Sequence, residues 1–511
     1  MRTAFKSTDK HAVQVEMAPR EESVAVVEAV NLERAAARAD SQTDAPPDGG
    51  FGWVCVLCTF FINAHTWGIN STYGVFLGFY LTHDFFPDTS ALDYAFIGGL
   101  SISMAMAIAP VATHIVHVYG SWACMHLGIF FETLALLGAS FSRQKYQIIL
   151  SQGVCFGWGM GLLFTSSVPI TPQWFTKKRS IATAISAAGS GCGAMIYSLA
   201  AQRAIDTVGL PWCLRILAIC SMGVNLIACN LVRDRNKETG ARHVALDMGI
   251  LKRREFILMQ AWGWCSMFAY IIVIFSLPAY ATSVGLSSSQ GATLNAILNV
   301  GQMVGRPFIG LASDRYGRIN TAMFSSFGAA LTVFCFWIPA EAVSDGYALV
   351  LFYSVVGGAL AGSYWCTVAG VVPEVVGLAD MPAALSLTWL SITVPTTLSE
   401  PIALLLRRTN RESWVYLPPQ LFTAFMFFGA GLSLWILRGW KIAELDLASA
   451  GQTVAENVTQ MKSGADIAEG PTVALPQDGG QADRIVSQEE ARRAAWKPRY
   501  LLPRMMAIKR V

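Results

Sequence analysis

GATLNAILNVGQMVGRPFIGLASDRYGRIN, at residues 291–320, is the stretch that decides the fold. Residues 292–311 are long and apolar enough to cross a bilayer as one helix. Four polar residues interrupt that run at spacings of four, three and four: Asn295, Asn299, Gln302 and Arg306. At about 100° per residue, these side chains share an arc of roughly 60°. Because a central arginine facing lipid costs about 2.5–3.5 kcal/mol, we predict that the stripe lines a protein interior or a watery pathway.

A second interpretation applies to Arg306 alone. About 12 Å of helix separates it from Asp314, so its long side chain could reach the membrane surface instead. Gly301 and Gly305 stand four apart on another side of the same helix. Small residues at that spacing favour the close approach of a neighbouring membrane helix.

The composition is that of a protein that crosses the membrane many times. Of the 511 residues, 53% are hydrophobic and only 14% are charged, well below the roughly 25% of soluble domains. The net charge of +3 does not suggest nucleic-acid binding. The eleven cysteines fall in apolar segments, and Cys55 and Cys58 form a pair with no partner pair. We therefore predict no disulfide framework, no metal site and no cofactor.

The order of apolar and polar segments predicts two six-helix bundles joined by a basic linker. Residues 1–47 and 441–511 are polar and are expected to be disordered cytosolic tails. The N-terminal bundle is expected at 48–232, the linker at 233–254 and the C-terminal bundle at 255–440. The twelve predicted spans are 52–80, 94–116, 122–141, 146–171, 180–201, 211–232, 256–281, 291–312, 319–340, 347–370, 382–406 and 417–439.

Basic residues in short loops place both termini in the cytosol. The loops on that side hold Lys177, Lys178 and Arg179, the linker cluster, and Arg315 with Arg318. The loop RRTNRE at 407–412 argues the other way. The triplets AIS at 184–186 and ALS at 384–386 recur 200 residues apart, which indicates two related halves.

Three motifs resemble those of the major facilitator superfamily, and within it the monocarboxylate porter branch of fungal type. DGGFGW at 48–53 is similar to that branch's signature at the mouth of helix one, and it is carried by Asp48, Gly49, Gly50, Gly52 and Trp53. GLASDRYGR at 310–318 is similar to the superfamily's loop motif, and Arg306-Pro307 resembles the branch's eighth helix. The resemblance implies an all-α membrane fold of twelve helices and transport of an organic acid.

The chain departs from this pattern at positions that matter for proton coupling. Proton-linked relatives carry a lysine where this chain has Ser71, and an aspartate where it has Gln302. The arginine is kept while two ionisable groups are absent. This favours a substrate bulkier or less acidic than lactate.

The candidate residues fall into three sets. The substrate pathway is assigned to Arg306, Gln302, Asn299, Asn295, Asn63, Thr66, Asn70, Trp365 and Trp389, although for the two tryptophans packing between helices is the safer interpretation. If transport is coupled to a proton gradient, the candidates are Glu132, His65 and Glu400, each of which could instead be structural. A gate is assigned to Asp314, Arg315 and Arg318, whose alternative role is anchoring at the membrane surface.

The sequence therefore predicts a secondary active transporter that works by alternating access on a small organic substrate. It is expected to act as a monomer in the plasma membrane. Export of a fungal secondary metabolite is favoured over uptake of a monocarboxylate or vitamin-like nutrient. A nutrient sensor that does not transport is the alternative from another class. No HExxH motif or paired intramembrane aspartates point to an enzyme.

Overall fold

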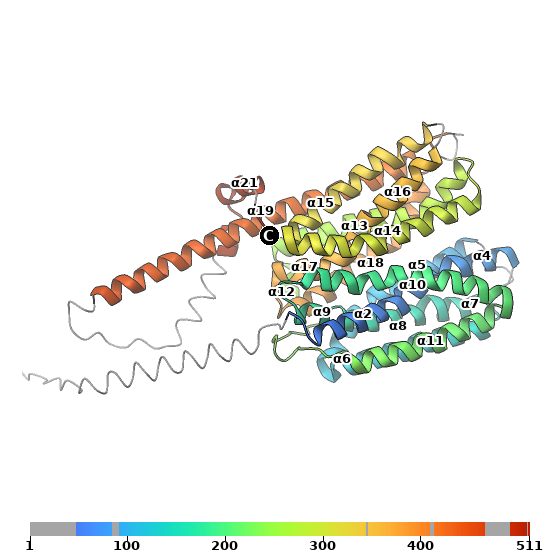
Figure 1. The fold of residues 1–511 in the computed structure, drawn as a ribbon, viewed down its shortest axis with the longest axis horizontal. Coiled ribbons are helices and arrows are strands. Elements are labelled where there is room, and N and C mark those ends of the chain that lie inside the picture. The colour runs from blue at the N-terminus through green and yellow to red at the C-terminus, as the bar shows by residue number, and fades with distance from the viewer. Residues whose placement is uncertain (1–47, 84–90, 344–345, 409–412, 466–490, 508) are drawn as a thin grey trace, which may run out of the picture. The chain divides into compact units, whose positions relative to one another are not determined.

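The computed structural model describes residues 48–83, 91–343, 346–408, 413–465, 491–507 and 509–511. The expectation for residues 1–47 lies outside this part of the chain. The described residues form helices and no strands (Figure 1). This confirms the all-α membrane fold.

The helices of the first half follow the predicted spans. Span one is built from three consecutive helices and span four from four segments, one of them the π-helix η1. The elements are α2 (Gly52–His65), α3 (Trp67–Ser71), α4 (Tyr73–His83), α5 (Ala91–Ala107), α6 (Ala109–Phe141), α7 (Lys145–Ile148), η1 (Ile149–Cys155), α8 (Phe156–Ser167), α9 (Ile170–Trp174), α10 (Arg179–Val208) and α11 (Leu210–Leu231).

The second half begins after a short helix in the linker, α12 (Met248–Leu251). Its elements are α13 (Arg254–Ser283), α14 (Ser288–Tyr316), α15 (Arg318–Thr332), η2 (Val333–Trp337), η3 (Pro339–Glu341), α16 (Gly346–Ala361), α17 (Ser363–Val376), α18 (Met381–Leu406), α19 (Leu417–Ala465) and α21 (Pro498–Met505).

Ten helical segments in the described chain are long and apolar enough to cross a membrane. Two predicted spans are not among them. α14 has the length but carries the polar stripe. The span at 94–116 is divided between α5 and the start of α6, whose helical geometry is interrupted at Gly120 (φ 84°). With these two segments, the described residues contain twelve of membrane length.

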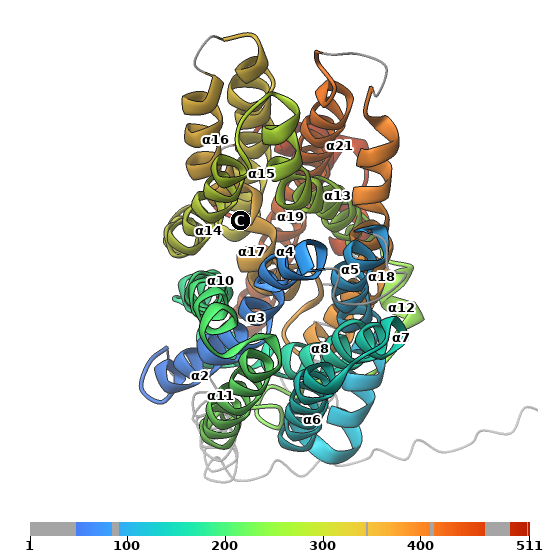
Figure 2. The same ribbon diagram turned by 90° about the vertical axis from the view of Figure 1, so that its right-hand side faces the viewer.

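Helices of the two halves pack against each other in two regions of the molecule. α10 packs against α14 and α17, and α5 packs against α18 (Figure 2). The approach of α10 and α14 is close, because a Cβ added at Gly310 would lie 2.5 Å from the Cβ of Ala184. Gly301 and Gly305 make the predicted close contacts with α16, where added Cβ atoms would lie 2.5 Å from Val355 O and from the Cβ of Ala359.

The end of the chain differs from the prediction of a disordered tail from residue 441. α19 continues to Ala465, and α21 packs against it (Figure 1). Trp440 stacks on Trp496 with ring centroids 5.9 Å apart, and Glu444 accepts from Arg492 at 2.7 Å. These contacts join segments about 50 residues apart, so local composition does not reveal them. The prediction is wrong for residues 441–465 and for 491–507, and 466–490 lie outside the described residues.

Candidate functional site

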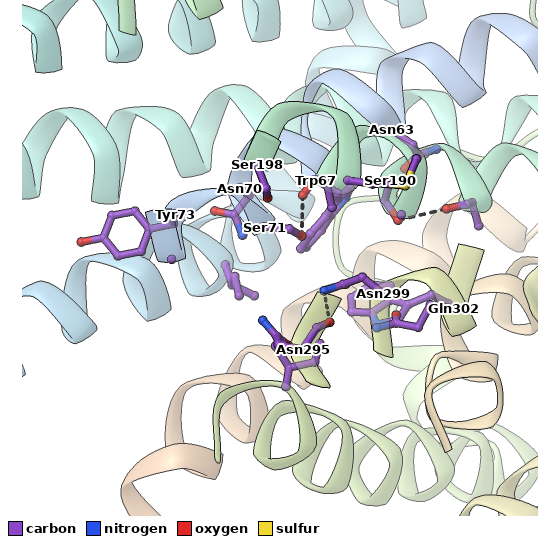
Figure 3. Close-up of a pocket in the computed structure, with 18 of the residues that line it drawn as sticks. Asn63, Trp67, Asn70, Ser71, Tyr73, Ser190, Ser198, Asn295, Asn299 and Gln302 are labelled. Atoms are coloured by element: carbon purple, nitrogen blue, oxygen red, sulfur yellow. Dashed lines mark hydrogen bonds between the residues drawn. The ribbon is translucent and has the colours of Figure 1, made fainter. Parts of the chain in front are cut away.

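A cavity of about 1240 Å³ lies between the two halves. Its walls come from α2, α3, α4, α5, α8, α9 and α10 of the first half and from α13, α14, α17 and α18 of the second (Figure 3). Along α10 the lining residues run from Thr183 to Asp206. That distance is roughly 35 Å of helix, so the cavity follows most of a membrane crossing.

The polar stripe of α14 forms one wall of this cavity. Asn295, Asn299, Gln302 and Arg306 all line it. Asn299 donates to the carbonyl oxygen of Asn295 at 2.9 Å (Figure 3), and the side-chain oxygen of Asn295 has no partner in the described part of the chain. The wall therefore presents amide groups that a ligand could bind.

Arg306 reaches across from the second half to the first. Its guanidinium donates to Ala187 O at 2.6 Å and to Ser190 Oγ at 2.5 Å, both on α10. It also donates to Gln302 Oε1 at 2.9 Å, and its side chain is only 4% exposed. The guanidinium contacts a neighbouring helix and does not extend toward the membrane surface.

The charge of Arg306 is not neutralised by a neighbouring acid. Among the described residues its hydrogen bonds all go to neutral oxygens, no ion pair includes it, and its Nε has no partner. Since arginine stays protonated in proteins, the site carries a permanent positive charge beside a cavity. Such a site can bind an anion through charge-assisted hydrogen bonds.

Aromatic rings form a second wall close to Arg306. Trp365 lies 5.2 Å from Trp67 and is stacked on Trp389 at 5.9 Å and 17°. Phe164 contacts Trp389 at 5.1 Å, and Tyr270 donates to Gln302 at 2.8 Å. All five rings line the cavity. They offer flat apolar surfaces that come from both halves.

Three of these aromatic residues were missed in the sequence: Trp67, Phe164 and Tyr270. A signal existed for Trp67, because it stands four residues after Asn63 and three before Asn70, on the same helical face. Asn63 and Asn70 do line the cavity. Thr66 is fully buried, donates to Ile62 O at 2.7 Å and is not part of the lining.

The three proton-coupling candidates lie away from the cavity lining. Glu132 is 1% exposed and accepts from Asn225 at 2.9 Å, while its other oxygen has no partner within the described ranges. His65 Nδ1 is 2.8 Å from Phe61 O. Glu400 accepts from Ser276 at 3.0 and 3.2 Å. The structure therefore gives each residue a local polar partner and brings none of them to Arg306.

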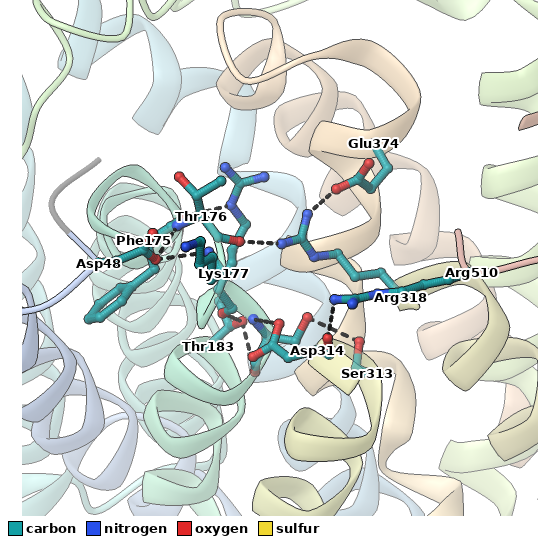
Figure 4. Close-up of polar contacts among 12 residues, drawn as sticks. Asp48, Phe175, Thr176, Lys177, Thr183, Ser313, Asp314, Arg318, Glu374 and Arg510 are labelled. Carbon is teal, nitrogen blue, oxygen red and sulfur yellow. Dashed lines mark hydrogen bonds and ion pairs between the residues drawn. The ribbon is translucent and has the colours of Figure 1, made fainter. Parts of the chain in front are cut away.

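Asp314 and Arg318 join the two halves at one end of the cavity (Figure 4). The carboxylate of Asp314 accepts from the backbone amides of Ser180 at 2.9 Å and Ile181 at 2.8 Å, in the first turn of α10. This is favourable because the first amides of a helix lack internal partners and carry partial positive charge.

Arg318 completes what we call the inter-half link, made of Asp314 and Arg318 on one side and Thr176, Ser180 and Ile181 on the other. Arg318 donates to Thr176 O at 2.7 Å and forms an ion pair with Glu374 (Figure 4). Arg315, the third predicted gate residue, is exposed and lies 5.6 Å above the ring of Tyr316. Among the described residues, Arg315 forms no hydrogen bond or ion pair with the first half.

The DGGFGW motif at 48–53 holds the loop that contributes Thr176 to this link. Asp48 adopts φ 51° and its Oδ1 accepts from the amides of Thr176 at 2.7 Å and Lys177 at 2.8 Å. Gly50 also has positive φ. A Cβ at Gly52 would lie 3.0 Å from both Trp174 and Phe175, and Trp53 packs edge-on against Phe175 at 5.0 Å. The motif therefore positions one side of the link.

The link closes the cavity at the end where α10 begins. The lining continues to the opposite end of the helices, where Phe79, Gln202, Asp206, Pro278 and Ala292 contribute to it. The described conformation is therefore closed on the side of the link, with its cavity extending toward the other side.

Relatives of this chain are fungal proteins described as transporters. It is 33% identical over 407 residues to "Probable transporter MCH2" of Saccharomyces cerevisiae, covering 79% of this chain and 85% of that one. It is 34% identical to "Uncharacterized transporter ESBP6" of the same yeast, covering 79% of this chain but 61% of that one. The "Fujikurins efflux protein" of Gibberella fujikuroi is 27% identical over 76% of this chain and 83% of its own length.

Solved structures share the fold at low sequence identity. The proton:xylose symporter XylE matches with a TM-score of 0.57 and 13% identity, over 75% of this chain and 94% of its own. The transporter FucP in its outward conformation matches with a TM-score of 0.58 and 12% identity, over 75% of this chain and 98% of the FucP chain. Residues 53–399 match the family model described as Major Facilitator Superfamily. The chain therefore belongs to the major facilitator superfamily of membrane transporters.

Proposed function

We propose that this transporter exports a bulky organic anion that has a flat apolar body. The cavity carries the proposal. About 1240 Å³ exceeds the 300–1,000 Å³ typical of small-molecule pockets. The guanidinium of Arg306, which has no acidic partner among the described residues, lies beside a wall of aromatic rings. A carboxylate or enolate would pair with Arg306, and rings would stack on Trp365.

Alternating access is supported by the contrast between the two ends of the cavity. The inter-half link joins the halves at one end through Asp314 and Arg318. Breaking that link and closing the far end would expose the same site to the other side of the membrane. Asp314 and Arg318 thus act as a gate, and Asp48 acts on it by holding the Thr176 loop.

The orientation that fits the distribution of basic residues places the gate in the cytosol, with both termini on that side and the protein in the plasma membrane. Lys177, Lys178 and Arg315 are exposed at that end. The described conformation then faces outward. Coupling to protons would use Glu132, His65 or Glu400 indirectly, through helix packing, because none of them lines the cavity.

Export is preferred because it suits a large amphipathic cavity and because one relative bears the name of an efflux protein. Uptake of a carboxylate or vitamin-like nutrient would use the same cavity in the opposite direction. The decisive experiment compares metabolites inside and outside cells with and without the gene. Export predicts that the substrate accumulates inside cells that lack the protein and is depleted outside, whereas the reverse pattern would establish uptake.

The site is then tested by Arg306→Lys with Arg215→Lys as the matched control. Arg215 is also in a membrane helix, where its Nε donates to Ser140 at 3.2 Å, but it does not line the cavity. Lysine keeps the charge and loses the forked geometry. Export per molecule at the cell surface should fall about tenfold or more for Arg306→Lys alone. Loss of surface protein in the same proportion would mean that Arg306 serves folding and not transport.

A further inference from the structure

Residues 491–507 and 509–511, here called the strap, form an unusually basic segment packed against α19. Residues 491–511 contain no Asp or Glu and seven cations, which are Arg492, Arg493, Lys497, Arg499, Arg504, Lys509 and Arg510. The strap includes α21, which lies beside α19 (Figure 1). A segment with this charge near a membrane is attracted to anionic lipids.

The contacts with α19 place the strap at the level of the lipid headgroups. α19 begins at Leu417, and Gly439 lies roughly 33 Å further along its axis, close to the thickness of the hydrocarbon core. A Cβ added at Gly439 would meet Met505 at 2.6 Å, and Trp435 Nε1 donates to Met505 O at 2.8 Å. The strap therefore runs alongside α19 where that helix leaves the membrane.

The strap presents cations and apolar side chains on its open face. Arg492 and Arg504 turn inward to acids of α19, pairing with Glu444 and Asp446 at 2.7 Å. Lys497 and Arg499 are exposed. Leu502 and Met506, four residues apart, are 62% and 77% exposed. This combination matches an interface that has anionic headgroups above acyl chains.

The strap also touches the junction of α14 and α15, where the gate residues Asp314 and Arg318 lie. The backbone oxygen of Val511 accepts from the amides of Ile319 at 3.1 Å and Asn320 at 3.3 Å, at the start of α15. Arg510 donates to the backbone oxygen of Asp314 (Figure 4), the residue whose carboxylate holds α10. Gly317, with φ 106°, leaves no room for a Cβ, which would lie 2.3 Å from Val511 O.

We propose that the strap binds anionic phospholipid headgroups of the leaflet on the gate side, and that this binding stabilises the closed gate. Lipid binding holds the strap in place, the strap holds the loop between α14 and α15, and that loop positions Asp314 against Ser180 and Ile181. The lipid composition of that leaflet would then regulate opening, which goes beyond substrate recognition in the central cavity.

Hydrogen–deuterium exchange on the full chain in nanodiscs tests the proposal without knowledge of the substrate. Nanodiscs of phosphatidylcholine alone are compared with nanodiscs containing about 30% phosphatidylserine. The anionic lipid should slow exchange of amides in the strap and of the first turn of α10. The double variant Lys497→Gln with Arg499→Gln should lose that protection, because each removed charge weakens binding of the strap to anionic lipid about fivefold. About 0.5 M salt should weaken it in the wild type.

Two controls keep the outcome decisive. Arg143→Gln with Arg203→Gln removes two exposed cations outside the strap, one in the loop between α6 and α7 and one near the C-terminal end of α10, and should leave the lipid effect unchanged. Inorganic phosphate added to phosphatidylcholine nanodiscs should have no effect. Equal exchange in both lipid compositions would overturn the proposal, and so would full protection by phosphate alone. Slowed exchange in the strap without any change at Ser180 and Ile181 would refute the connection to the gate.

Discussion

Replacing Asp314 should open the gate by an amount that the structure allows us to calculate. Its two oxygens accept from Ser180 and Ile181 at 2.9 and 2.8 Å. Hydrogen bonds to a charged group contribute about 1.5–3 kcal/mol each, and the carboxylate is half-buried, so the lower values apply. Asp314→Ala removes both bonds, about 3 kcal/mol. Asp314→Asn keeps one acceptor oxygen and therefore loses about half of this stabilisation of the closed gate.

In terms of populations, these energies shift the ratio of open to closed gate about 150-fold for alanine and about tenfold for asparagine. Spin labels at Lys177 and Tyr316, both exposed and on opposite sides of the link, report that ratio as a distribution of distances. The exposed Cys220 and Cys335 are first replaced by serine so that they are not labelled. The fraction of molecules with a long distance between the two labels should rise in the order wild type, Asp314→Asn, Asp314→Ala.

Asp247→Ala is the matched control. Its carboxylate also accepts from two amides at a helix start, Gly249 at 2.8 Å and Ile250 at 3.3 Å, but this contact lies within the linker. Its removal should leave the distances unchanged. If Asp314→Ala changes the distribution no more than Asp247→Ala does, the carboxylate does not hold the halves together and the argument for a gate fails.

Three further predictions concern the helix packing, the buried acid and the aromatic wall. Gly159→Ala should lower the thermal unfolding temperature by several degrees, because its Cβ would lie 2.4 Å from the Glu132 amide nitrogen. Gly138→Ala should leave that temperature unchanged, because the nearest atom to its Cβ would be the Cβ of Ser151 at 3.6 Å. Glu132→Gln should fold normally and remove the pH dependence of transport; unchanged dependence would exclude Glu132 from proton coupling. Trp365→Ala should raise KM about tenfold, and an equal effect of the exposed Trp212→Ala would argue against stacking.

The sequence predicted the helical architecture because bilayer thickness imposes a length on every span. The same reasoning identified α14, whose Asn295 and Arg306 break an apolar run at helical spacing and do lie on the cavity wall. It failed for residues 441–465 and for the strap. Their order depends on pairs such as Trp440 with Trp496, which composition alone cannot show.

Prediction of the site was limited by the same lack of tertiary information. Thr66 shares a helical face with Asn63 in the sequence, yet it is fully buried and absent from the cavity lining. Glu132 and Glu400 stood out as acids in apolar segments, but a sequence does not show which helix faces them. The structure gives them Asn225 and Ser276 as partners, and neither acid is among the residues that line the cavity.

The polarity of α14 has a consequence for how the protein is made. At 29 residues it is long enough to cross a bilayer, yet it is not among the ten segments apolar enough to do so unaided. A nascent segment with amides and an arginine enters lipid poorly on its own. α14 packs against α13 and α16, so we expect the ribosome to have completed these neighbours before α14 leaves the translocon. Nascent chains stopped directly after α14 should therefore remain only partly inserted.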